Sequence, residues 1–258
     1  MREAQSLAAG VHNRAGVVLL HGISSRSLFL RRLEHNLRRE GFATLNLDYQ
    51  SRKKPLEELA KDIRPAIAAF AENNCGPIHF VGHSMGGLLV RVYLANHRPV
   101  RLGRVVMLGT PNKGSEIVDL LKPYPAYRAW FGPAGLQLAT LQDAMLTSLP
   151  PLDYAVGIIA GCRSLLHPIA SRFILPRPND GRVSVQSCKL TGMADHTIVK
   201  ASHTALPFIA LPSVKRLRSC RTGASRIRWR RDARLPCLKR ISRGRLLSDE
   251  RETGRRRP

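Results

Sequence analysis

The residues best placed to do chemistry lie in a short glycine-rich segment, Gly82-His83-Ser84-Met85-Gly86. It fits the pattern Gly-x-Ser-x-Gly, follows a strand-like apolar run over 78–81, and precedes a helical repeat that reaches about His97. A serine at such a strand-to-helix turn sits on strained backbone, and small neighbours let the strand and helix close around it. The positive end of the following helix also favours negative charge there. The pattern therefore predicts that Ser84 is a nucleophile, and an ordinary serine in a glycine-rich turn is the alternative.

A histidine is needed to activate this serine, because a serine hydroxyl does not ionise at neutral pH without a base held by a carboxylate. In this kind of turn the chain order is serine, then acid, then histidine. Most of the nine histidines lie in strands, turns or helix ends that precede the expected acid. We favour His203 as the base, because it follows the strand-like run 197–199 and a loop there can reach back to Ser84. His196 is the alternative.

The expected acid is Asp180, which lies in the turn sequence Pro178-Asn179-Asp180-Gly181 after a strand-like apolar run. A plain turn aspartate would have the same sequence, so the structural alternative stays open. Asp195 is the second candidate, although its position next to His196 favours a structural role.

Two backbone N–H groups are expected to bind the oxyanion of a tetrahedral intermediate. One is the N–H of Met85, the residue after the serine. The other is the N–H of Ile23, in the turn His21-Gly22-Ile23 that follows the first strand-like run. We expect His21 to be a structural residue.

The elements that would position these residues alternate between strand and helix. The expected strands cover 16–20, 42–47, 78–81, 105–108 and 154–160, and the expected helices cover 27–40, 55–74 and 85–97. This alternation predicts an α/β fold with a mostly parallel central sheet and helices on both faces. Residues 115–150 mix prolines and aromatics with short helical patterns, which predicts a partly helical cap. The apolar residues Leu120, Leu121, Trp130 and Phe131 suggest an acyl chain as its ligand, though a structural cap core explains them nearly as well.

Composition excludes several classes of protein. The chain has 258 residues, of which 43% are hydrophobic, and no apolar run approaches the ~20 residues of a membrane span. The N-terminal residues lack the apolar run of a signal peptide, so we expect a cytoplasmic protein. The five cysteines form no Cys-x-x-Cys pair, which argues against a disulfide framework or a zinc site.

The net charge of +24 is divided unevenly along the chain. Residues 214–258 carry 17 Lys and Arg against 4 Asp and Glu, so this short tail holds more than half of the excess charge. The sequence therefore predicts a folded domain over 1–213 and a separate basic, Arg-rich tail over 214–258.

At these residues the chain resembles the α/β-hydrolase superfamily, and within it the bacterial lipase- and esterase-like serine hydrolases. The matching segments are VVLLHGI (17–23), FATLNLDYQSR (42–52), VGHSMGG (81–87), VVMLGTPNKGSE (105–116), GIIAGCRS (157–164), PNDGRVSV (178–185) and MADHTIVKASHT (193–204). The resemblance implies hydrolysis of a small-molecule carboxylic ester through an acyl-enzyme, with no cofactor and no metal. It implies the same roles for Ser84, Asp180 and His203, with Ile23 and Met85 as oxyanion donors.

The chain departs from this resemblance after Val214, where relatives usually have a closing helix and this chain shows no sustained apolar stripe. Three interpretations stay open for the tail. It is a disordered basic extension, a segment that binds nucleic acid or anionic lipid, or the product of a shifted reading frame. Two alternatives to an esterase follow: a thioesterase or amidase with the same residues, and a non-catalytic basic protein that binds through its tail. The sequence does not indicate an oligomeric state.

Overall fold

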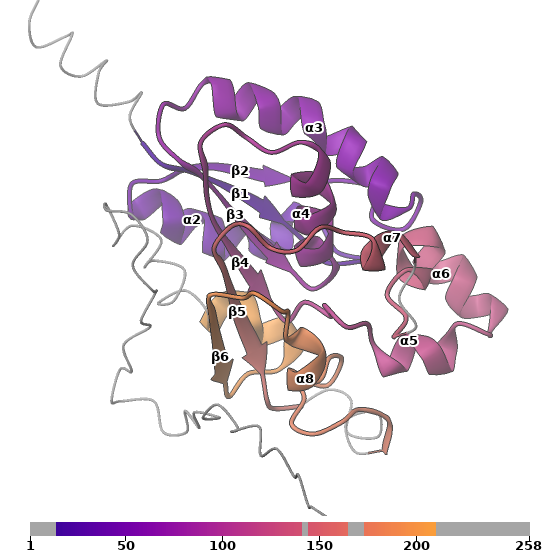
Figure 1. Ribbon diagram of the computed structural model, residues 1–258. Helices are drawn as coiled ribbons and strands as arrows, with labels where there is room; N and C mark the ends of the chain where they lie inside the picture. The colour runs from indigo at the N-terminus through magenta and orange to yellow at the C-terminus, as the bar shows by residue number, and fades with distance from the viewer. Residues whose placement is uncertain (1–13, 141–143, 165–172, 210–258) are drawn as a thin grey trace, which may run out of the picture.

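The computed structural model describes residues 14–140, 144–164 and 173–209, and its centre is a six-stranded parallel sheet (Figure 1). The strand order is β2-β1-β3-β4-β5-β6, and every neighbouring pair is parallel. The strands are β1 (Gly16–Leu20), β2 (Ala43–Leu47), β3 (Ile78–His83), β4 (Leu102–Leu108), β5 (Val156–Gly161) and β6 (Asp195–Val199). The observed sheet is parallel, as the sequence predicts.

Helices cover both faces of the sheet, because the side chains of its central strands are apolar on both sides. Val18 and Leu20 of β1 pack into a core with α3 (Leu56–Glu72) and α4 (Met85–Asn96). Val17 and Leu19 pack into a second core on the other face. There the covering elements are η1 (Ser27–Leu30), α2 (Arg31–Arg39) and α9 (Leu206–Ile209). The fold also has α8 (Val185–Cys188) and η3 (His203–Ala205).

The observed elements differ from the predicted ones mainly at their ends. The helix predicted over 27–40 is a 3-10 turn followed by α2, and the strand predicted over 105–108 begins earlier, at Leu102. The strand predicted over 154–160 runs from Val156 to Gly161. The ends of the two strands are set by pairing with a neighbouring strand, and such contacts are not visible in local sequence patterns.

Three helices form the cap region, beyond the arrowheads of β1 and β2 in Figure 1. They are α5 (Glu116–Leu121), α6 (Pro125–Leu136) and α7 (Ala144–Thr147). The side chain of Gln137 joins this region to α3, where its Oε1 accepts from Leu56 N at 2.8 Å and its Nε2 donates to Glu57 at 3.0 Å. Of the apolar cap residues, Leu120 and Trp130 are exposed, whereas Leu121 and Phe131 pack against the core.

No helix in the described ranges is long and apolar enough to cross a membrane. The predicted tail over 214–258 lies outside the described residues, and the division at residue 213 stays a prediction.

Candidate active site

Ser84 lies at a sharp turn between β3 and α4. Its backbone has φ 56° and ψ −127°, a left-handed conformation that is strained for a residue with a side chain. A Cβ added at Gly82 would lie 2.5 Å from the backbone of Gly87, and one at Gly86 would lie 2.2 Å from the carbonyl oxygen of Leu20. A residue with a side chain would therefore not fit at either position, as the Gly-x-Ser-x-Gly pattern predicts.

Asp180 and His203 form a buried pair in the segments that follow β5 and β6, and His203 is the first residue of η3. His203 Nδ1 lies 2.7 Å from Asp180 Oδ2, and His203 N donates to the Asp180 carbonyl at 3.0 Å. The second carboxylate oxygen, Oδ1, accepts from Arg182 N at 2.9 Å and from Val183 N at 2.8 Å. Both residues are nearly inaccessible, at 2% for Asp180 and 4% for His203.

The charge state of Asp180 follows from these contacts. Burial opposes its ionisation, but His203 and the two backbone N–H donors outweigh burial and hold the pKa of the carboxyl below its ordinary value. An ionised Asp180 keeps the proton of His203 on Nδ1 and leaves Nε2 free to accept one, which is the arrangement that a general base requires.

Gly109 shows that this pair lies beside the serine turn. A Cβ on Gly109 would be 3.1 Å from Asp180 Oδ2 and 3.2 Å from His203 Nδ1. In the sheet, His83 of β3 is opposite Leu108 of β4, and Ser84 N donates to the Leu108 carbonyl at 2.8 Å. Ser84 and Gly109 therefore leave the ends of adjacent strands side by side.

The described residues provide no hydrogen bond for the Ser84 hydroxyl. Catalytic hydrogen bonds in free enzymes are often long and shorten when substrate binds, so this geometry is compatible with proton transfer to His203.

His83 links the serine turn directly to the predicted base, a contact that the sequence patterns do not predict. Its Nε2 lies 3.0 Å from the carbonyl oxygen of His203, and the two rings lie 4.9 Å apart. Burial lowers the pKa of His83 to about 3, so its ring is neutral at pH 7. A neutral ring facing a carbonyl carries its proton on Nε2, so His83 donates to the backbone of His203. The position of His83 directly before Ser84 is the only sequence signal for this role. Its hydrogen-bond partner, His203, lies 120 residues further along the chain.

The two predicted oxyanion donors belong to segments that lie close to Ser84. Met85 is the first residue of α4, so its N–H has no acceptor within the helix. The loop that carries Ile23 is also close, because a Cβ on Gly22 would be 3.0 Å from Ser84 Cβ.

His21 is the buried residue that shapes this loop. Its ring stacks on Tyr49 at 4.1 Å, and its Nδ1 lies 2.8 Å from the Gly22 carbonyl. Burial lowers the pKa of His21, which fits the structural role predicted for it.

The alternative acid and base lie elsewhere. Asp195 and His196 are inside β6, where Asp195 pairs with Gly157 at the amino end of β5. Asp180 and His203 instead follow the carboxyl ends of the strands, where Ser84 lies. Within the described ranges, no group of three or more His, Cys, Asp or Glu side chains could hold a metal ion.

Comparison with known proteins agrees with this architecture. The profile of the alpha/beta hydrolase family matches residues 17–212. The mature form of the Bacillus licheniformis lipase BlEst2 is 18% identical, with a TM-score of 0.65, and the match covers 79% of this chain and 91% of the lipase. The metagenomic carboxyl esterase MGS0156 is 17% identical, with a TM-score of 0.67 and coverages of 81% and 76%. At these identities the structures show the fold, and the profile match shows that the chain belongs to the alpha/beta hydrolase family.

Proposed function

We propose that the chain is a serine hydrolase that cleaves carboxylic esters, with Ser84 as nucleophile, His203 as general base and Asp180 as the acid that orients it. The observation that carries the proposal is the buried Asp180–His203 pair against Gly109, next to the strained turn of Ser84. The lipase and the carboxyl esterase with this fold support an ester as substrate.

In the proposed reaction, His203 Nε2 takes the proton of the Ser84 hydroxyl as the oxygen attacks the ester carbonyl. The N–H groups of Met85 and Ile23 donate to the oxyanion of the tetrahedral intermediate. His203 then gives its proton to the leaving alcohol, which departs and leaves an acyl group on Ser84. Water, deprotonated by His203, attacks this acyl group, and the carboxylic acid product leaves as the proton returns to Ser84.

Apolar contacts in the cap region favour a substrate with an apolar acyl group. Phe131 stacks on Tyr127 at 4.6 Å, and Ile23 reaches to 3.2 Å from the position of a Cβ on Gly135. The oxyanion loop and the cap are thus in apolar contact, and an acyl chain entering between them would meet apolar side chains.

Labelling with a fluorophosphonate tests whether Ser84 is activated. We expect the full chain to react with one equivalent, and peptide mass spectrometry to find the adduct on Ser84. Ser84→Ala should abolish labelling and lower kcat on a short-chain p-nitrophenyl ester by about three or more orders of magnitude. Ser148→Ala is the matched control, because Ser148 is exposed in the cap region. Full activity in Ser84→Ala, or a label on another serine, would contradict the proposal. A panel of esters, thioesters and amides with one acyl group then defines the bond that is cleaved.

A further inference from the structure

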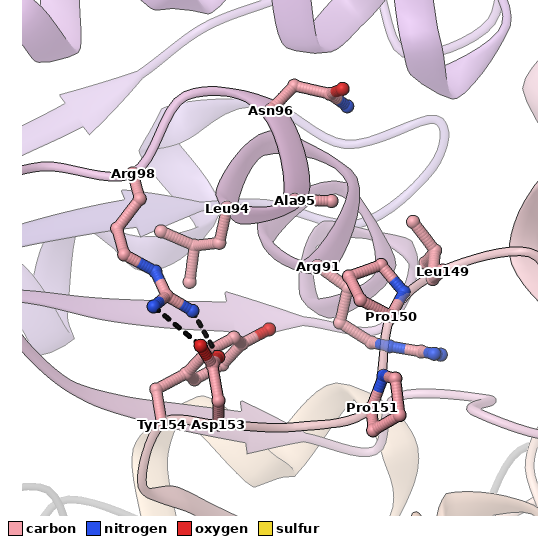
Figure 2. A pocket seen from close by; sticks show the side chains of 10 residues that line it. All are labelled: Arg91, Leu94, Ala95, Asn96, Arg98, Leu149, Pro150, Pro151, Asp153 and Tyr154. Carbon is pink, nitrogen blue, oxygen red and sulfur yellow. Dashed lines mark hydrogen bonds and ion pairs between the residues drawn. The ribbon is translucent and has the colours of Figure 1, made fainter.

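A pocket lies along α4, away from the serine turn. A pocket of about 570 Å³ opens between the C-terminal half of this helix and the segment that leads into β5 (Figure 2). Arg91 lies seven residues after Ser84, which places it roughly 10 Å along the helix axis. The pocket is therefore distinct from the proposed active site, and the inference does not depend on chemistry at Ser84.

The charges that line this pocket do not cancel. Three lining residues are charged: Arg91, Arg98 and Asp153. Both carboxylate oxygens of Asp153 accept from the guanidinium of Arg98, with Nη1 at 2.8 Å from Oδ2 (Figure 2). The charges of Arg98 and Asp153 therefore cancel. The charge that remains is that of Arg91, which has no carboxylate partner in the described part of the chain.

Arg91 has lost much of its contact with water. Its side chain is half-buried beside Pro150 and Pro151, and burial lowers the pKa of its guanidinium. An arginine stays protonated at neutral pH even so, with five N–H donors in a planar fork. A partly desolvated cation of this kind is stabilised by an anion that supplies acceptors in the same plane.

Tyr154 adds a second polar group on the same side of the pocket. Its hydroxyl points toward Arg91 in Figure 2, while Arg98 lies 5.3 Å from the centre of its ring. Burial raises the pKa of Tyr154, so the hydroxyl is neutral and can donate. Asn96 also lines the pocket, and its Nδ2 donates to the Val92 carbonyl at 3.1 Å. The remaining walls are apolar, from Leu94, Ala95, Leu149 and the two prolines.

We propose that this pocket binds a small organic carboxylate, with the oxygens paired to the Arg91 guanidinium and the hydrocarbon part against the apolar walls. One uncompensated positive charge matches the single charge of a carboxylate, and the guanidinium fork matches its two oxygens. A phosphate carries more charge than this pocket balances and has no hydrocarbon part to cover the leucine and proline side chains.

Calorimetric titration of the full chain with hexanoate tests the site. We expect saturable binding of hexanoate and none of hexanamide, which has the same chain and no charge. Arg91→Gln should weaken this binding by about tenfold or more, since a hydrogen-bonded ion pair is lost. Arg39→Gln is the matched control, because Arg39 is exposed on α2 and its replacement removes the same charge from the chain. It should leave hexanoate binding unchanged.

A second measurement covers the case in which Arg91→Gln does not fold. Phenylglyoxal modifies accessible arginines, and peptide mass spectrometry of the wild-type chain should show that hexanoate protects Arg91 and not Arg39. The proposal is overturned if hexanoate does not bind, if hexanamide binds equally well, if both variants bind alike, or if hexanoate leaves the modification of Arg91 unchanged.

Discussion

Replacing Asp180 by asparagine separates the charge of this residue from its shape. Oδ1 of Asp180 accepts from two backbone N–H groups, at 2.9 Å from Arg182 and 2.8 Å from Val183. An asparagine keeps these bonds only if its own oxygen occupies that position. Its NH2 group must then face His203 Nδ1, which lies 2.7 Å from Oδ2 in the wild-type chain.

The consequence of Asp180→Asn is the wrong tautomer of His203. An NH2 group donates to Nδ1, so the histidine proton moves to Nε2, and that nitrogen can no longer accept the proton of Ser84. We expect kcat to fall by about three to four orders of magnitude, which corresponds to ~4–5.5 kcal/mol of transition-state stabilisation. The fold should persist, because the backbone hydrogen bonds of the loop are kept.

Initial rates on a short-chain p-nitrophenyl ester measure this effect, and circular dichroism checks that the variant is folded. Asp195→Asn is the matched control, because it makes the same substitution inside β6, where Asp195 Oδ1 accepts from His196 N at 2.8 Å. It should retain most of the wild-type rate. A folded Asp180→Asn variant with wild-type kcat, or an equal loss in Asp195→Asn, would refute the assignment of the acid.

Two further predictions concern buried histidines. His83→Phe removes the donor to the His203 carbonyl, so kcat should fall about tenfold with little change in KM, because one hydrogen bond that positions the base is lost. His83→Gln, whose amide can donate from a similar place, should recover most of the rate, and equal rates for both variants would show that His83 does not position the base. Stability should fall as the pH is lowered from about 6.5 toward about 4, because burial lowers the pKa of His79 to about 4 and of His83 to about 3. In this range the unfolded chain binds protons at these sites that the folded chain does not, so the loss approaches ~3 kcal/mol per pH unit for the two histidines. Urea unfolding at several pH values measures this slope, His79→Gln should reduce it, and a flat profile would contradict the buried neutral state.

Local sequence determined the frame of the protein and the sharp turn at Ser84. The alternation of apolar runs predicted a parallel sheet with helices on both faces, because each pattern reports which side of an element is buried. The two glycines around Ser84 predicted the sharp turn, since the space that they provide is needed by residues only a few positions away.

Contacts between distant residues decided the rest. Sequence left two acids and two histidines open. The register of β6 on β5 holds Asp195 and His196 within a strand, whereas Asp180 lies in a loop and His203 begins η3. The link from His83 to His203 spans 120 residues, and the bond from Gln137 to the start of α3 spans 81. Local propensity contains no information about such pairs, since the packing of the whole chain brings them together. The pairing of charges around Arg91 is also a property of the folded chain. Only the structure shows that the carboxylate of Asp153 is already paired with Arg98.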